Sequence, residues 1–134
     1  MKRIILVITA SKALRFLLQT VLQDKFKIIA ATDASDAMFW LSRSNVPAAI
    51  VIDPELPDTE PWEMVEYFKS SGLYDNIPLV VISSLPEQEL KIRCKNYAVN
   101  AFFTKPFNPI DLLNELENHL GEVRPLKKGL LKVV

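Results

Sequence analysis

Three polar side chains occupy positions where buried strands would end. Asp53, Ser83 and Lys105 each come directly after a short run that is rich in apolar residues. In an open α/β sheet, ligands bind in the crevice outside the carboxyl ends of the strands. A carboxylate, a hydroxyl and an ammonium group meeting there are the parts of a site that accepts a phosphoryl group, because that chemistry depends on positioning and on neutralising charge.

The first apolar run, residues 4–8, is not followed by an acid. Thr9, Ala10 and Ser11 come next, and the first carboxylate of the chain is Asp24. Magnesium prefers hard oxygen ligands and is usually held by carboxylates. A phospho-acceptor site at this edge of a sheet would therefore lack the acids that hold its metal.

Five apolar runs alternate with stretches of helical periodicity, in which apolar residues recur every three or four positions. The runs predict strands at residues 4–8, 26–31, 48–52, 79–82 and 101–104. The periodic stretches predict helices with apolar faces at residues 14–22, 34–41, 64–68, 90–98 and 112–120. This alternation indicates a parallel sheet with helices on both of its faces.

Residues with capping preferences predict where these helices begin and end. Pro61 is expected near the first position of the third helix, where a missing N–H costs little. Ser84 and Glu87 form a capping-box pattern at the start of the fourth helix. The remaining ends are predicted at Ser11 before the first helix, Gly72 past the third and Gly121 after the last.

Right-handed crossovers force such a chain into a doubly wound sheet. Five strands fit the flavodoxin-like order 2-1-3-4-5 of an α/β fold. In that order the carboxyl ends of strands one, three, four and five converge on one crevice. The topology would place Thr9, Ala10, Asp53, Ser83 and Lys105 together.

Length and composition narrow the class of protein. The chain has 134 residues with 16 basic and 16 acidic side chains, which suits one domain with one core. Balanced charge argues against a dedicated nucleic-acid binder, which would carry a basic excess. Cys94 is the single cysteine, so a reducing, cytoplasmic setting is the simplest expectation. The apolar run at residues 4–8 is too short for a membrane span.

Three motifs at the predicted strand ends resemble those of a known family. They are residues 50–57 (IVIDPELP), 78–84 (PLVVISS) and 102–107 (FFTKPF). Together, in this order and at these separations, they are similar to the receiver domain of two-component response regulators, which has a CheY-like fold. The resemblance runs from about residue 2 to about residue 120, which is nearly the whole chain.

The resemblance implies a role for each residue of the predicted crevice. Asp53 corresponds to the aspartate that accepts the phosphoryl group, and Ser83 to the hydroxyl that turns toward it. Lys105 corresponds to the lysine that pairs with that group, and Phe102 to the aromatic residue that moves on activation. The Lys105–Pro106 bond is often cis in the family.

The sequence departs from the family at several positions. Thr9 and Ala10 stand where receivers usually carry two adjacent magnesium-binding acids. Pro61 and Ala98 stand where receivers commonly have glycine. Glu55 is a minor candidate for a replacement metal ligand. We therefore expect no cofactor, or weak magnesium binding.

Losing two acids removes repulsion around Asp53. Lys105 would then be the main charge partner of Asp53, and one unit-charge pair near 4 Å is worth about 4 kcal/mol at a surface-like dielectric. We therefore expect Lys105 to contact Asp53 in the resting protein.

These observations predict a single signalling domain rather than an enzyme. Residues 1–121 would form the receiver-like domain, and residues 122–134 a basic and apolar tail that either frays or docks on a partner or a membrane surface. The domain would act through the face formed by its fourth helix, fifth strand and fifth helix. The partner would be a histidine kinase, a downstream effector or a second copy of the chain.

Two forms of this function stay open. In the first, Asp53 is phosphorylated in a conventional phosphorelay. In the second, which the missing acids favour, the domain binds partners with weak or no phosphorylation. A flavin-binding or enzymatic flavodoxin-like domain is a remote third alternative, because the segment after the first strand has no glycine to cradle a phosphate.

Other reactive or aromatic side chains have simpler interpretations. Cys94 is expected to be a small core residue. Trp62 is expected to pack in the core, with covering the rim of the crevice as the weaker alternative. His119 is expected to be a solvated residue on the last helix.

Overall fold

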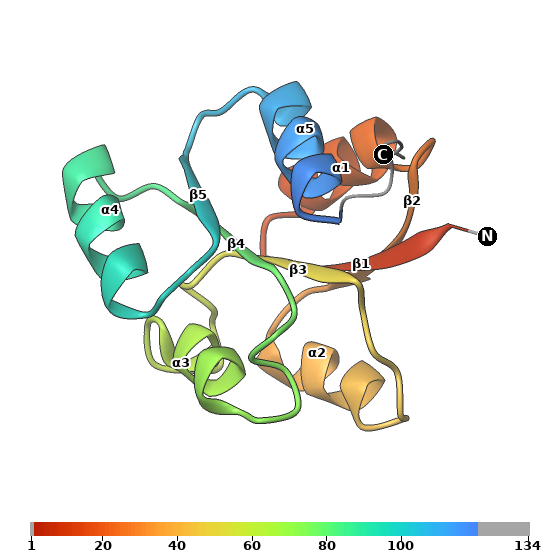
Figure 1. Ribbon diagram of the computed structural model, residues 1–134, viewed down its shortest axis with the longest axis horizontal. Helices are drawn as coiled ribbons and strands as arrows, with labels where there is room; N and C mark the ends of the chain where they lie inside the picture. Colours follow the sequence, from red (N-terminus) through yellow and green to blue (C-terminus); the bar gives the residue numbers. More distant parts are fainter. Residues whose placement is uncertain (1, 121–134) are drawn as a thin grey trace, which may run out of the picture.

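The computed structural model describes residues 2–120, which form five strands alternating with five helices. Figure 1 shows their arrangement. The strands are β1 (Arg3–Ile8), β2 (Phe26–Ala31), β3 (Ala49–Ile52), β4 (Leu79–Ser83) and β5 (Ala101–Thr104). The helices are α1 (Lys12–Leu22), α2 (Ala34–Leu41), α3 (Glu63–Ser70), α4 (Glu87–Asn96) and α5 (Pro109–Leu120). Each predicted strand and helix is present.

All five strands pair in parallel in the order β2-β1-β3-β4-β5, which confirms the predicted flavodoxin-like topology. All residues of β3 and β4 are buried. Strands buried on both faces need apolar side chains at every position, which is why these runs are continuous rather than alternating. This order puts the carboxyl ends of β1, β3, β4 and β5 at one edge of the sheet.

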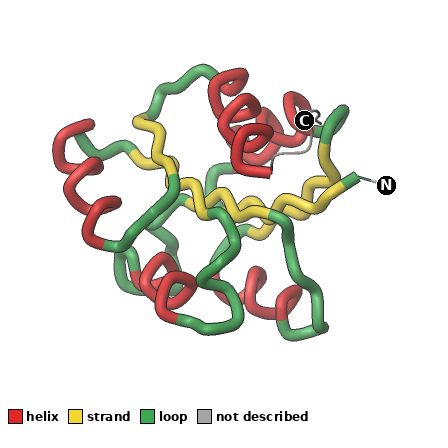
Figure 2. Tube along the Cα trace, in the orientation of Figure 1, coloured by secondary structure: helices red, strands yellow, loops and turns green. Residues whose placement is uncertain are grey.

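Helices cover both faces of the sheet (Figures 1 and 2). α1 and α5 pack on one face, where Ile5 and Val7 join a buried cluster with Leu18 and Leu112. α2, α3 and α4 pack on the other face with the alternate side chains of the same strands. The two clusters form the core on either side of the sheet. None of the described helices is long and apolar enough to cross a membrane.

The predicted start of α1 is confirmed, whereas that of α3 is wrong. Ser11 caps α1 and its Oγ accepts the Leu14 N–H at 3.1 Å. α3 begins at Glu63, so Pro61 lies outside the helix. Trp62 intervenes with a left-handed φ of 69°, and its N–H donates to the Pro54 carbonyl at 2.9 Å. This turn separates Pro61 from the helix.

The capping box predicted for α4 is also wrong. α4 begins at Glu87 after Pro86, and the N-cap makes no side-chain hydrogen bond. The residue before a proline is disfavoured in the helical region, so Leu85 cannot start the helix. Its N–H donates instead to the Ser83 Oγ at 3.1 Å. Ser84 is therefore too far from the helix start to cap it.

Glycine usually takes the left-handed position at the end of a helix, but α3 and α4 do not follow this pattern. Gly72 follows α3 as predicted, but its φ is not in the left-handed range and open space surrounds the position of a Cβ. Ala98 follows α4 with a left-handed φ of 57°. This is where the family usually has glycine, because L-residues with a side chain pay a steric penalty there. Gly121 and the tail 122–134 lie outside the described residues.

Candidate functional site

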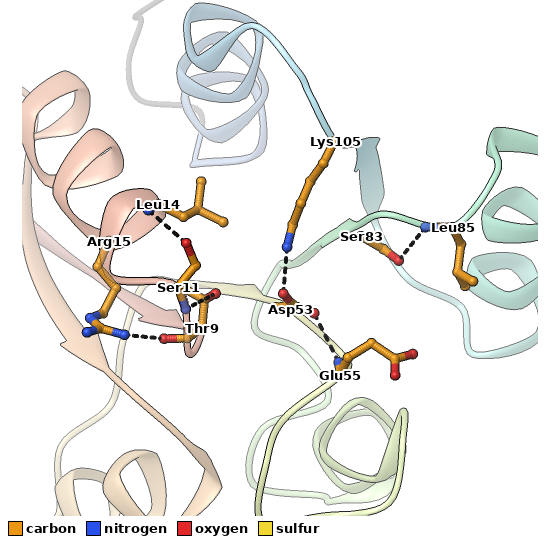
Figure 3. A network of polar contacts seen from close by, with 9 residues as sticks. All are labelled: Thr9, Ser11, Leu14, Arg15, Asp53, Glu55, Ser83, Leu85 and Lys105. Atoms are coloured by element: carbon orange, nitrogen blue, oxygen red, sulfur yellow. Dashed lines mark hydrogen bonds and ion pairs between the residues drawn. The ribbon is translucent and has the colours of Figure 1, made fainter.

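The predicted crevice residues meet at the carboxyl edge of the sheet (Figure 3). Asp53 follows β3, and its N–H donates to the Ile8 carbonyl of β1 at 2.9 Å. Lys105 follows β5, and its N–H donates to the Ser83 carbonyl of β4 at 2.8 Å. These bonds continue the strand pairing past the strand ends, so the sheet itself fixes where the three side chains begin.

Lys105 and Asp53 form a close ion pair. The Lys105 Nζ lies 2.7 Å from the Asp53 Oδ2, which confirms the contact expected from the sequence. The Asp53 side chain is 12% exposed and that of Lys105 is 27% exposed. A charge-assisted hydrogen bond of this length is among the stronger polar contacts in proteins. The Lys105–Pro106 peptide bond is cis, as it often is in the resembled family.

The other Asp53 oxygen is also occupied. Oδ1 accepts the Glu55 N–H at 3.0 Å, so the carboxylate holds the start of the following loop as well as the lysine. The Glu55 side chain is exposed rather than turned onto Asp53 (Figure 3). Both carboxylate oxygens therefore have a donor in this arrangement.

Ser83 lies beside the ion pair but is engaged elsewhere. It is 1% exposed, and its Oγ accepts the Leu85 N–H, pointing away from Asp53 in Figure 3. An open pocket of about 340 Å³ lies between the ion pair and the start of α4. It is lined by Asp53, Glu55, Ser83, Ser84, Leu85, Pro86 and Lys105.

Thr9 and Ala10 lie at the same edge, at the end of β1. Thr9 is fully buried and its Oγ1 accepts the Ser11 N–H at 3.2 Å, while Ala10 is exposed. The Arg15 Nη1 donates to the Thr9 carbonyl at 2.7 Å. No motif predicts a role for Arg15, and the only signal in the sequence is its place one turn after the helix cap. A cation therefore approaches the strand end that carries no acid.

This set of donors does not fit a magnesium ion. Within residues 2–120, no three His, Cys, Asp or Glu side chains are grouped closely enough to hold a metal. Thr9 offers one neutral oxygen that already accepts a hydrogen bond. Asp53 is paired with a cation on one oxygen and a backbone donor on the other. Magnesium requires several oxygen ligands in near-octahedral geometry.

Phe102 lies on β5 opposite Val81 and packs, partly buried, on the cluster beneath α2, α3 and α4. Its ring lies on the same face of the sheet as α4. We propose that Phe102 is the aromatic residue that moves on activation, because it lies beside α4.

The remaining side chains have simpler roles. Cys94 is buried, and burial raises the pKa of its thiol to about 11. His119 lies on the surface of α5 with its side chain 26% exposed, and its Nε2 is 2.8 Å from the Glu115 Oε2. Trp62 is 1% exposed and lies in the core, so the weaker expectation that it covers the crevice rim is wrong.

Comparison with known proteins identifies the family. A model of the response regulator receiver domain matches residues 5–117. Hybrid signal transduction histidine kinase D of Dictyostelium discoideum is 26% identical over 117 residues, which is 87% of this chain and 8% of that protein. The phosphate regulon transcriptional regulatory protein PhoB of Escherichia coli K12 is 26% identical over 127 residues, 94% of this chain and 55% of that protein. The chain thus spans only part of these relatives.

Solved structures show the same fold. The chemotaxis response regulator CheY4 of Vibrio cholerae superposes with a TM-score of 0.77 at 22% identity, covering 89% of this chain and 99% of that one. The family model covers most of the chain, and the sheet order is the one shared with these structural neighbours. The chain therefore belongs to the response regulator receiver family.

Proposed function

We propose that the chain is an atypical receiver that signals through protein–protein contacts, with weak or no phosphorylation at Asp53. The observation that carries this proposal is the Lys105–Asp53 ion pair, formed beside a strand end that bears Thr9 and Ala10 in place of acids. The likeness to two-component relatives supports a role in signal transduction in the cytoplasm. We expect the chain to have no enzymatic activity of its own.

The physical reason is electrostatic. Phosphoryl transfer to Asp53 brings additional negative charge toward a carboxylate, and a divalent cation normally neutralises it. Lys105 supplies one positive charge, and that charge is already paired with the acceptor oxygen. We expect magnesium binding to be absent or weak, and the resting ion pair to take over part of the arrangement that phosphorylation would create.

The competing proposal is a conventional receiver phosphorylated at Asp53. Beryllofluoride with magnesium separates the two, read by backbone NMR shifts near Asp53. We expect no shifts at concentrations that saturate a receiver with the acid pair. Shifts that disappear in Asp53→Ala would establish the conventional form instead. Acetyl phosphate with magnesium, read by tryptophan fluorescence, gives a second reading of the same question.

The proposed partner surface is the face formed by α4, β5 and α5. Ile92 on α4 is 62% exposed, and Phe102 on β5 is only partly buried. The outward side of α4 carries Lys91 and Lys95, whereas α5 carries Asp111 in its first turn. An exposed apolar residue among separated charges of both signs suits a specific protein partner.

Two occupants of this face are compatible with its charges. One is a histidine kinase or effector with complementary groups. The other is a second copy of the chain, because a two-fold axis would set Lys91 and Lys95 on α4 of one copy against the acidic α5 of the other. Light scattering at increasing concentration tests the second. Self-association that Lys91→Glu with Lys95→Glu abolishes, and that Lys2→Glu with Lys27→Glu leaves intact, would support the homodimer; a monomer at all concentrations excludes it.

A flavin carrier on this fold stays a remote alternative. It requires a loop that binds a phosphate after β1, and residues 9–12 contain no glycine there. Visible absorbance of the purified chain, or flavin released on denaturation, would support this alternative. We expect neither.

A further inference from the structure

Trp62 combines two features that each cost free energy. Its backbone lies in the left-handed region at φ 69°, where a bulky L-residue is sterically disfavoured. Its side chain is 1% exposed, and its indole Nε1 has no hydrogen-bond partner among residues 2–120. Strained backbones persist only where the surrounding structure enforces them, and they cluster at functional sites, while a buried donor without a partner needs an explanation of its own.

The surroundings that hold Trp62 belong to two different parts of the molecule. Its N–H donates to the carbonyl of Pro54, the residue after Asp53. Its ring stacks on Tyr97 at the end of α4, with the centroids 5.7 Å apart and the planes 10° from parallel. The Arg93 guanidinium of α4 lies 5.7 Å from the Trp62 ring centroid. Trp62 therefore bridges the loop after Asp53 and the helix α4.

The loop is in turn held by the ion pair. Asp53 binds Lys105 through one oxygen and the Glu55 N–H through the other. Trp62 closes the same loop back onto Pro54. A change in the charge or position of the Asp53 carboxylate is thus passed to the loop start, and the loop end carries the indole that packs on α4.

We propose that Trp62 is a conformational switch that couples the Asp53 carboxylate to α4. While the ion pair is intact, the loop keeps the indole buried in its strained position against Tyr97. When the pair is lost, the backbone of Trp62 leaves the left-handed region and the indole moves toward solvent, where its N–H gains a partner. Tyr97 and Arg93 then lose their stacking partner, which changes the surface of α4.

This switch requires neither a phosphoryl group nor a metal, so it goes beyond the proposed function and fails or stands independently of it. It is also separate from Phe102, which lies on β5 rather than in the loop after Asp53. Any event that draws Lys105 away from Asp53, including the docking of a partner, would operate it.

Fluorescence of Trp62 alone tests the proposal. The chain has two tryptophans, so Trp40→Phe leaves Trp62 as the single reporter. In that background, Lys105→Met removes the ion pair. We expect Trp62 emission to shift to longer wavelength, acrylamide quenching to rise and the indole N–H resonance to move. Asp53→Asn should act in the same direction, which guards against a fault specific to one variant.

The matched control is Lys25→Met in the same background. It removes another lysine ion pair, with the Lys25 Nζ 3.3 Å from the Glu117 Oε2. Circular dichroism confirms that each variant is folded before its fluorescence is compared. Unchanged Trp62 emission and quenching in both crevice variants would overturn the switch. So would an equal response to Lys25→Met, since it would report general loosening.

The coupling to α4 has its own readout. In Lys105→Met, hydrogen exchange should accelerate at α4 amides near Arg93 and Tyr97 and stay unchanged in α2. Trp62→Gly relieves the backbone strain and removes the ring, so Lys105→Met should have no additional effect on α4 exchange in that background. Full, additive effects of the two substitutions would contradict the proposed pathway.

Discussion

The Asp53 carboxylate is bonded to the Lys105 ammonium through one oxygen and to the Glu55 N–H through the other. At the end of β1, Thr9 is fully buried and Ala10 is exposed, and under the proposed function they stand in place of two metal-binding acids. If these two residues explain the absent metal ligands, restoring them should restore a metal response.

Thr9→Asp with Ala10→Asp should therefore gain magnesium-dependent binding of beryllofluoride, measured by tryptophan fluorescence titration. The added carboxylates supply hard oxygen ligands next to Asp53. Thermal stability without metal should fall, because one of the new acids is buried beside another carboxylate. Ala10→Asp alone is the control, since it adds one acid at an exposed position. A double variant that still ignores magnesium would show that other features of the crevice prevent binding.

Ala98 is a second position where a single side chain decides the energetics. Its left-handed backbone favours glycine, so Ala98→Gly should stabilise the fold by about 1 kcal/mol. Gly72→Ala is the matched control: Gly72 has no left-handed φ and open space for a methyl group, so it too should stabilise, by about 0.4–1 kcal/mol through the unfolded chain. Urea unfolding measures both. Destabilisation by Ala98→Gly would mean that the methyl group packs better than its backbone geometry indicates.

At the scale of elements, the loop after Asp53 is tied to the start of α2 as well as to α4. The Asp58 carboxylate accepts the N–H groups of Ala34 at 3.0 Å and Ser35 at 2.9 Å. Free N–H groups at a helix start favour a negative charge. The hydrogen bonds from Ala34 and Ser35 accordingly lower the pKa of Asp58 below its ordinary value of 3.8.

The hydrogen bonds that Asp58 accepts from Ala34 and Ser35 make the free energy of unfolding depend on pH. Because the pKa of Asp58 is lower in the folded chain than in the unfolded one, its contribution is fully present above the ordinary value of 3.8 and is lost as pH falls through the folded value. Asp58→Asn should therefore lower Tm at neutral pH, and the difference from the parent chain should shrink toward pH 3. Asp75→Asn, at an exposed acid after α3, serves as the control. A Tm difference between Asp58→Asn and the parent chain that stays constant with pH would show that the charge of Asp58 does not stabilise the start of α2.

The elements themselves were predictable, whereas some of their ends were not. Continuous apolar runs and helical stripes depend on burial, which is a property of many residues, so β1 to β5 and the sheet order follow from the sequence. The starts of α3 and α4 depend on single backbone conformations, at Trp62 and before Pro86. Similarly, the contact between Lys105 and Asp53 follows from charge, but the orientation of the Ser83 hydroxyl toward Leu85 depends on a local turn that no pattern reveals.

At the scale of the whole molecule, the two clusters of the core sit on opposite faces of one sheet and share its strands. Cys94 belongs to the cluster beneath α2, α3 and α4. It reports on that cluster because it is the only thiol in the chain. Burial raises its pKa to about 11, so the reactive thiolate is scarce in the folded state near pH 8.

The Cys94 thiol should therefore react with a disulfide reagent at pH 8 only when the molecule opens. We expect labelling far slower than that of the urea-unfolded chain, with a rate that follows the global stability of variants such as Ala98→Gly. Mass spectrometry of labelled and unlabelled chains measures it. Rapid labelling of the folded protein would show that α4 detaches on its own, which would lower the cost of any signal sent through that helix.

The backbone hydrogen bond between Lys105 and Ser83 ties the two strands that carry these residues to one another. Because the Lys105 N–H donates to the Ser83 carbonyl across the last two strands, the sheet fixes the spacing between the backbones that carry the ammonium group and the hydroxyl. A graft of either residue onto another scaffold would therefore need the neighbouring strand to come with it.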